Sequence, residues 1–219
     1  RSSAASDVYK RQAVYLRRYH HYESKTAFYL HRLLHSPKAV RFAEPDALVE
    51  KVTESLSISL APEQLEAVRT AARSKVMVLT GGPGTGKTTI INAIIRLFAE
   101  VKAKILLAAP TGRAAKRMGE LCDRDAQTIH RMLGMTFNDQ TGEVTFTKGE
   151  KEPLEADALI VDETSMVDLS LMRALLAALR PGCRLVLVGD PDQLPSVGAG
   201  NVFGDLIRSG VVPSVALTE

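Results

Sequence analysis

Residues 76–88 read Val76-Met77-Val78-Leu79-Thr80-Gly81-Gly82-Pro83-Gly84-Thr85-Gly86-Lys87-Thr88. An apolar strand pattern leads into a glycine-rich loop that ends in Lys-Thr, and a helical pattern from Ile90 to Phe98 follows. Glycines let backbone N–H groups turn inward around a polyphosphate, and the start of a helix adds the positive end of its dipole. This order of strand, loop and helix predicts a phosphate-binding P-loop.

The P-loop supplies most of a predicted site for a nucleoside triphosphate. The Lys87 ammonium can reach the β- and γ-phosphates, and the Thr88 hydroxyl can ligate Mg²⁺. The residues expected to contact the nucleotide here are Gly82, Pro83, Gly84, Thr85, Gly86, Lys87, Thr88 and Thr89.

Composition limits the class of protein without identifying a partner. The 219 residues are 45% apolar and 24% charged, which is typical of a globular protein with one large domain, alone or with a small appendage. Neither a signal peptide nor an apolar run of about 20 residues is visible, so we expect no membrane contact. The net charge of +3 is too small to indicate nucleic acid by itself. Cys122 and Cys183 lack metal-ligand spacing and are expected to be buried thiols in a reducing cytoplasm.

The first 60 residues are expected to precede the main domain. Residues 1–12 have no apolar periodicity and are interpreted as a non-native or disordered leader. Residues 13–60 are predicted to form a helical N-terminal region, with helices over 13–35 and 45–54. Four histidines lie in the first of these helices, and we interpret them as solvated rather than as metal ligands because no Cys, Asp or Glu is suitably spaced with them.

Residues 61–219 are predicted to form a nucleotide-binding domain of the α/β class. After a helix over 63–74, apolar strand patterns alternate with helical ones. Strands buried on both faces read as continuous apolar runs, which predicts a parallel sheet with helices on both sides. A β-hairpin is predicted within 136–147. The expected strands are 75–80, 104–109, 157–162, 184–189 and 214–218, and the expected helices are 87–100, 112–121, 126–133, 168–179 and 200–208.

Three side chains after the predicted strands complete a candidate catalytic set with Lys87. Asp162 and Glu163 follow the apolar run 158–161. Asp162 can hold Mg²⁺, and Glu163 can orient and deprotonate an attacking water. Gln193 follows the next strand, where it can hydrogen-bond the γ-phosphate or the water, because ligands gather at the carboxyl ends of parallel strands.

Five motifs in order carry a family resemblance. They are Gly81–Thr88, Ala109–Ala115, Thr128–His130, Asp162–Met166 and Gly189–Val197. With these motifs the chain resembles superfamily-1 helicases, most closely their RecD-like branch of 5′→3′ DNA helicases. The resemblance implies that residues 61–219 form an ATP-binding motor lobe with a RecA-like P-loop NTPase fold, a three-layer domain with a parallel sheet, preceded by a small helical region. It also implies ATP-driven unwinding of DNA.

The resemblance implies further site residues. Gln64 matches an upstream glutamine that reads the adenine edge, so ATP with Mg²⁺ is the expected ligand pair. Two further motifs match contacts to single-stranded DNA, the expected partner, through its backbone and stacked bases. The residues in these two motifs are Pro110, Thr111, Gly112, Arg113, Thr128 and His130.

The resemblance also implies what lies beyond the last residues, Val215-Ala216-Leu217-Thr218-Glu219. In the family this Leu-Thr-Glu leads into an arginine that touches the γ-phosphate and then into a second RecA-like lobe. We therefore expect a fragment with one motor lobe, inactive alone, whose second lobe or partner subunits are missing. The alternatives are the helicase part of a conjugative relaxase and a non-catalytic ATP-binding switch. A small-molecule kinase would not need the motifs at 109–115 and 189–197.

Overall fold

The structure is a computed structural model that describes residues 16–56, 58–140, 142–193 and 196–218. The predicted leader over 1–12 and the predicted first helical residues, 13–15, lie outside the described residues. Within the described part of the chain, none of the helices combines the length and the apolar character that crossing a membrane requires.

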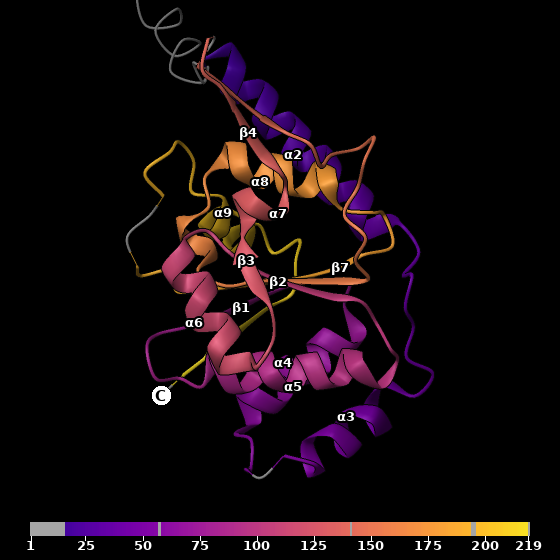
Figure 1. The fold of residues 1–219 in the computed structure, drawn as a ribbon. Helices are drawn as coiled ribbons and strands as arrows, with labels where there is room; N and C mark the ends of the chain where they lie inside the picture. The colour runs from indigo at the N-terminus through magenta and orange to yellow at the C-terminus, as the bar shows by residue number, and fades with distance from the viewer. Residues whose placement is uncertain (1–15, 57, 141, 194–195, 219) are drawn as a thin grey trace, which may run out of the picture.

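A six-stranded parallel sheet forms the middle of the molecule (Figure 1). Its strand order is β3-β2-β6-β7-β1-β8, so the P-loop strand β1 lies between β7 and β8. All six carboxyl ends therefore point to one edge, where ligands gather in such sheets. The strands are β1 Val76–Gly81, β2 Ile105–Ala109, β3 Ala126–Thr128, β6 Ala158–Val161, β7 Arg184–Gly189 and β8 Ser214–Leu217.

Alternate side chains of each central strand enter two different cores. In β1, Val76 and Val78 pack on one face while Met77 and Leu79 pack on the other. All four are at most 1% exposed. The period-two geometry of a strand places successive side chains on opposite faces, so a strand covered on both sides must be apolar throughout.

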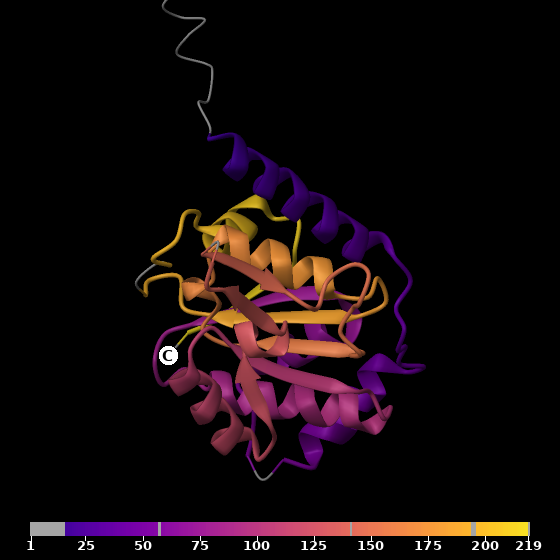
Figure 2. The same ribbon diagram turned by 45° about the horizontal axis from the view of Figure 1, so that its top comes forward.

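Helices cover both faces of the sheet and make the fold three-layered (Figures 1 and 2). This confirms the predicted α/β RecA-like class. One face carries α2 Arg17–His35, α8 Leu169–Ala178 and α9 Val202–Ser209. The opposite face carries α3 Pro45–Glu54, α4 Pro62–Arg73, α5 Lys87–Glu100 and α6 Gly112–Cys122.

The helix predicted over 126–133 is wrong in its first half. Residues Ala126–Thr128 form the edge strand β3, which pairs in parallel with β2, and only Ile129–Met132 form a short helix, α7. The Thr128 hydroxyl caps α7 by accepting a hydrogen bond from the Arg131 backbone N–H at 3.2 Å. Three residues of strand are too few to show a period of two, and pairing with a neighbouring strand decides their conformation.

The predicted hairpin is confirmed. Its strands are β4 Met135–Asn138 and β5 Glu143–Phe146, which pair antiparallel in a separate two-stranded sheet. A short 3-10 helix, η1 Thr164–Met166, follows β6.

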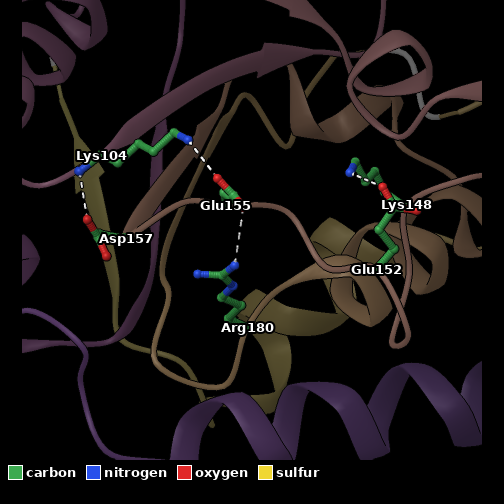
Figure 3. Close-up of polar contacts among 6 residues, drawn as sticks. All are labelled: Lys104, Lys148, Glu152, Glu155, Asp157 and Arg180. Atoms are coloured by element: carbon green, nitrogen blue, oxygen red, sulfur yellow. Dashed lines mark hydrogen bonds and ion pairs between the residues drawn. The ribbon is translucent and has the colours of Figure 1, made fainter.

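The segment that leads from the hairpin to β6 is held by polar contacts (Figure 3). The Lys104 backbone N–H donates to the Asp157 carboxylate at 2.8 Å, and the Lys104 ammonium lies 3.3 Å from the Glu155 carboxylate. Arg180, beyond the end of α8, reaches the same Glu155 carboxylate at 3.8 Å. These contacts join the segment before β6 to the start of β2 and to the residues that follow α8.

A buried arginine joins the N-terminal helical segment to the sheet. Arg184, at the start of β7, is 2% exposed and donates to the carbonyls of Ala71, Ala72 and Ser74 at 2.9 to 3.1 Å. It also donates to the Val40 carbonyl at 3.2 Å, in the segment between α2 and α3. The arginine therefore connects three segments that are distant in sequence: the start of β7, the end of α4 and the segment between α2 and α3.

Candidate functional site

The P-loop connects β1 to α5 through two glycines in the left-handed region. Gly84 and Gly86 have φ values of +84° and +86°, which side chains with a Cβ rarely adopt. Helix α5 starts at Lys87, and its N-cap Gly86 offers no side chain to accept from the first-turn N–H groups. Those N–H groups are therefore available to an anion at the positive end of the helix dipole.

Lys87 lies against the loop that it follows. Its ammonium donates to the carbonyls of Gly81 and Gly82, both at 2.6 Å. The Thr85 hydroxyl donates to the Gly82 carbonyl as well, at 3.0 Å. These bonds hold the loop closed on itself, with the positive charge of the lysine at its centre.

Gln64 reaches the P-loop from the first turn of α4. Its Nε2 donates to the Thr85 carbonyl at 3.3 Å, while its Oε1 accepts from the Ala61 N–H at 3.1 Å. A Cβ added to Gly86 would lie 2.5 Å from Gln64 Nε2. The amide is therefore packed directly on the loop, on the part that Gly86 leaves open.

A cavity of about 210 Å³ brings the predicted catalytic residues together. It lies between the start of α5, one side of α6 and the carboxyl ends of β6 and β7. Predicted groups that are distant in sequence, from Lys87 to Gln193, therefore face one space. The lining residues are Pro83, Gly84, Lys87, Thr88, Ile91, Ala114, Arg117, Met118, Leu121, Cys122, Asp162, Glu163 and Gln193.

Burial changes the acidity of the two carboxyls in this cavity. It raises the pKa of Asp162 above its ordinary value, against the lowering effects of the Glu163 backbone N–H and the charge of Lys87. The pKa of Glu163 is raised first by burial and then by the neighbouring charge of Asp162. A carboxylate with a raised pKa is a stronger base, which suits proton abstraction near pH 7.

Glu163 also has an unusual backbone. Its φ is +53°, and the Asp162 carboxylate accepts its N–H at 2.8 Å. Left-handed residues other than glycine are uncommon, and they gather at functional sites where surrounding structure enforces them. Here the turn into η1 is held by the Thr164 hydroxyl, which donates to the Val161 carbonyl at 3.1 Å.

Gln193 enters the cavity from the turn after β7. Its backbone N–H donates to the Asp190 carbonyl at 3.2 Å, and the Asp190 carboxylate accepts from the Asp192 N–H at 3.0 Å. Asp190 is only 6% exposed, so this turn is anchored from inside the fold. Residues 194–195 of the same motif lie outside the described residues.

Helix α6 contributes lining residues that sequence reasoning missed. Ala114, Arg117, Met118 and Leu121 have the i, i+3, i+4, i+7 spacing of one helix face. That spacing is visible in the sequence, but only the packing of α6 beside α5 shows which side of the helix faces the cavity. Cys122 continues the lining, and burial raises the pKa of its thiol to about 11, so the thiol is neutral at pH 7.

The residues predicted to contact DNA begin at one edge of the sheet. Ala109 and Thr128 are register partners at the carboxyl ends of β2 and β3. The helices α6 and α7 start beside each other there. The Thr111 hydroxyl caps α6 by accepting from the Ala114 N–H at 3.2 Å, while Arg113 is exposed.

His130 faces a different cavity, of about 670 Å³, between the hairpin, α2 and α8. Its ring centroid lies 6.2 Å from that of Phe146. The structure therefore places Thr128 beside the Thr111 turn and directs His130 toward the hairpin.

Comparison with known proteins shows the family. A family model described as an AAA domain matches residues 64–199, more than half of the chain. The chain is also 41% identical over 197 residues to the ATP-dependent RecD2 DNA helicase of Deinococcus radiodurans. The chain belongs to this AAA domain family. Within it, the chain is similar to RecD-like helicases. The resemblance drawn from the five motifs is thereby confirmed.

The chain matches only part of these RecD-like relatives. The alignment with the Deinococcus protein covers 90% of this chain and 26% of that relative. The RecBCD enzyme subunit RecD of Mycolicibacterium smegmatis is 44% identical over 169 residues, which cover 67% of this chain and 30% of the subunit. The chain thus spans about a quarter to a third of the length of these relatives.

Solved structures agree with the RecA-like fold. The Pif1 helicase from Candida albicans is 25% identical to this chain, with a TM-score of 0.52. The match covers 74% of this chain and 40% of the Pif1 chain. A Pif1 helicase from a study of unwinding at forked double-stranded DNA is 23% identical, with a TM-score of 0.51 and coverage of 74% of this chain and 44% of that one.

Proposed function

We propose that this chain is the ATP-binding and ATP-hydrolysing lobe of a RecD-like 5′→3′ DNA helicase. The observation that carries the proposal is the cavity that Lys87, Thr88, Asp162, Glu163 and Gln193 line together. A P-loop by itself would support nucleotide binding only. Two half-buried carboxyls and an amide at the same cavity add the groups that hydrolysis requires.

The lining residues fit Mg²⁺ with a triphosphate. The Thr88 hydroxyl and the Asp162 carboxylate are hard oxygen ligands, which Mg²⁺ prefers, and both face the cavity. When bound, the ion would neutralise charge on the phosphates. Gly82 and Gly84 support the fit, because no atom lies within 4 Å of where a Cβ would stand on either residue, which leaves room for phosphate oxygens.

Each residue then has a defined task. The Lys87 ammonium exchanges the carbonyls of Gly81 and Gly82 for phosphate oxygens, and the first-turn N–H groups of α5 bind the same anion. Glu163 orients a water for in-line attack and accepts its proton, aided by its raised pKa. Gln193 hydrogen-bonds the terminal phosphate or the water and so responds to hydrolysis.

Gln64 is proposed to select the base. A side-chain amide can pair with N6 and N7 of adenine together, as in major-groove recognition. Its contact with the Thr85 carbonyl places it beside the loop that holds the phosphates. ATP is therefore the preferred nucleotide.

Single-stranded DNA is the proposed partner. Its phosphates would lie along the edge where β2 and β3 end, on Pro110, Thr111, Gly112 and Arg113. Thr128 is proposed to continue this track, and His130 to contact the strand only where it passes the hairpin that His130 faces. Such contacts are electrostatic and independent of base sequence, so binding weakens with salt.

Calorimetry with Mg-ATP tests the proposal. The purified chain should bind Mg-ATP, and Lys87→Ala should abolish binding. Lys104→Ala should leave binding unchanged, because Lys104 lies at the amino-terminal end of β2, opposite to the carboxyl ends that form the cavity. A fold check by circular dichroism accompanies each variant. Equal affinity of wild type and Lys87→Ala would contradict the site.

Fluorescence anisotropy with a labelled oligonucleotide tests the DNA contact. The proposed contact is contradicted if Arg113→Ala alters neither the affinity for DNA nor the salt dependence of that affinity.

A further inference from the structure

The cavity contains a cation whose role the proposed function leaves open. Lys87 and Arg117 are the two basic side chains among its described lining residues. The Lys87 ammonium, which donates to two loop carbonyls, is the one that the proposed function assigns to the phosphates. The Arg117 guanidinium makes no hydrogen bond or ion pair with any other described residue, and its side chain is exposed. Arg117 nevertheless lines the same cavity as Asp162 and Glu163, and its charge acts to lower the pKa of both carboxyls.

The backbone beneath Arg117 is held firmly. The neighbouring side chains Ala115 and Met118 are 4% and 2% exposed, so α6 is anchored on both sides of this position. The exposed guanidinium can swing while its Cα stays in place. A planar guanidinium offers paired donors that match phosphate oxygens, and it stays charged at any physiological pH.

The start of the same helix faces DNA in the proposed function. Arg113 and Arg117 are four residues apart, about 6 Å along the helix axis. Thr111 caps the helix and Gly112 is exposed, so the first turn of α6 lies at the carboxyl edge of the sheet. One short helix therefore carries the proposed DNA contact in its first turn and a free cation toward the nucleotide in its second.

We propose that Arg117 binds the terminal phosphate of the nucleotide and that α6 links this contact to the DNA-contacting turn at its own amino-terminal end. The inference rests on the proposed function, because it takes nucleotide and DNA at the sites described above. Arg117 would contact the terminal phosphate when ATP is bound and would lack that contact when ADP is bound. Helix α6 would therefore be held differently in the two nucleotide states. Thermodynamic linkage then makes DNA affinity depend on the nucleotide, and nucleotide affinity depend on DNA by the same factor.

Nucleotide binding tests the phosphate contact. The dissociation constants of the β,γ-imido analogue of ATP and of ADP, each with Mg²⁺, are compared in calorimetry. Arg117→Gln should lose about tenfold or more of the wild-type preference for the triphosphate, and Arg117→Lys should recover part of it. Lys116→Gln is the matched control, since Lys116 is the adjacent residue on α6, lies outside the cavity and pairs with Glu120 at 3.8 Å. An unchanged triphosphate preference in Arg117→Gln would overturn the proposal, as would equal losses for both nucleotides.

DNA binding tests the link. Wild type and Lys116→Gln should bind an oligonucleotide with an affinity that changes by roughly fivefold or more when the imido analogue is added. Arg117→Gln should keep its nucleotide-free DNA affinity and lose that change. A change that persists in Arg117→Gln would overturn the link. If wild type fails to bind any Mg-nucleotide, the proposed function itself fails. If wild type binds Mg-nucleotides and Arg117→Gln matches it in triphosphate preference and in nucleotide-dependent DNA affinity, the proposed function stands and this inference falls.

Discussion

The Gln64 side-chain amide donates to the Thr85 carbonyl at 3.3 Å, so a helix that precedes β1 hydrogen-bonds the P-loop directly. The same side chain accepts from the Ala61 N–H and so caps its own helix. One glutamine thus positions both the start of α4 and the edge of the nucleotide site. These two roles can be separated, because capping uses the oxygen and the loop contact uses the nitrogen.

Gln64→Glu should reduce the preference for ATP over GTP. The carboxylate keeps an acceptor for the Ala61 N–H, since Glu also serves at this capping position, but it has no N–H for adenine N7 or the Thr85 carbonyl. We expect the preference to fall by roughly tenfold, the effect of one lost specific hydrogen bond. Competition binding with the two nucleotides measures it. Preserved discrimination would remove Gln64 from base recognition.

Gly86→Ala should destabilise the fold by roughly 1–3 kcal/mol, because the position is left-handed and a Cβ there would lie 2.5 Å from Gln64 Nε2. Gly82→Ala is the matched control: no atom lies within 4 Å of its Cβ position, and its φ is not positive. Urea unfolding of both variants without nucleotide gives the comparison. Similar unfolding free energies would show that the loop rearranges easily.

Asp162→Asn should stabilise the nucleotide-free chain and abolish Mg²⁺-dependent nucleotide binding. The folded-state pKa of Asp162 lies above its ordinary value, so between the two values the folded chain holds more protons than the unfolded chain. The stability that this group contributes is therefore present below its ordinary pKa and is lost as pH rises through its raised folded-state pKa. The asparagine of the variant does not ionise, so the variant does not lose stability in this way.

The expected gain of Asp162→Asn at pH 7 is roughly 0.5–2 kcal/mol, the size of a typical single stabilising substitution. Urea unfolding at several pH values should show the difference from wild type growing as pH rises above the ordinary range for a carboxyl. A difference that is constant or shrinks with pH would contradict the raised pKa of Asp162 in the folded chain.

Arg184→Met should destabilise the chain by about 2–4 kcal/mol, because four backbone carbonyls lose a charged donor inside the protein. The apolar stem of methionine keeps contact with Phe42, over whose ring the guanidinium lies at 4.6 Å. Arg208→Met removes an exposed arginine paired with Asp205 and should cost less than about 1 kcal/mol. Equal losses in the two variants would assign Arg184 no special structural role.

The 219-residue chain should hydrolyse ATP very slowly and unwind no DNA by itself. In the proposed function the catalytic groups of the described residues all line one cavity, and an arginine finger from elsewhere typically supplies about 10³–10⁵ in rate. Phosphate release with and without oligonucleotide measures turnover. A DNA-stimulated rate near about 1–10 s⁻¹, within the ordinary enzyme range, would refute this expectation.

Sequence reasoning succeeded where local chemistry is specific. Glycine spacing before Lys87 requires a turn with inward N–H groups, and a four-residue apolar run before Asp162 requires a buried strand, so both elements and the family were predictable. It failed at Ala126–Thr128, which carries no periodic signal. Those residues become a strand because the neighbouring β2 offers unpaired backbone groups that they can satisfy.

The class of fold, the P-loop and the proposal of Asp162 and Glu163 as catalytic carboxyls follow from the amino-acid sequence alone, because they depend on short runs of residues with strict backbone and chemical requirements. Three relationships required the folded chain: which side of α6 faces the proposed nucleotide cavity, that the Gln64 amide donates to the Thr85 carbonyl, and that Arg117 lines the same cavity as Asp162 and Glu163. Such relationships depend on how strands pair and helices pack across long separations. That packing is governed by burial summed over the whole core rather than by any local pattern.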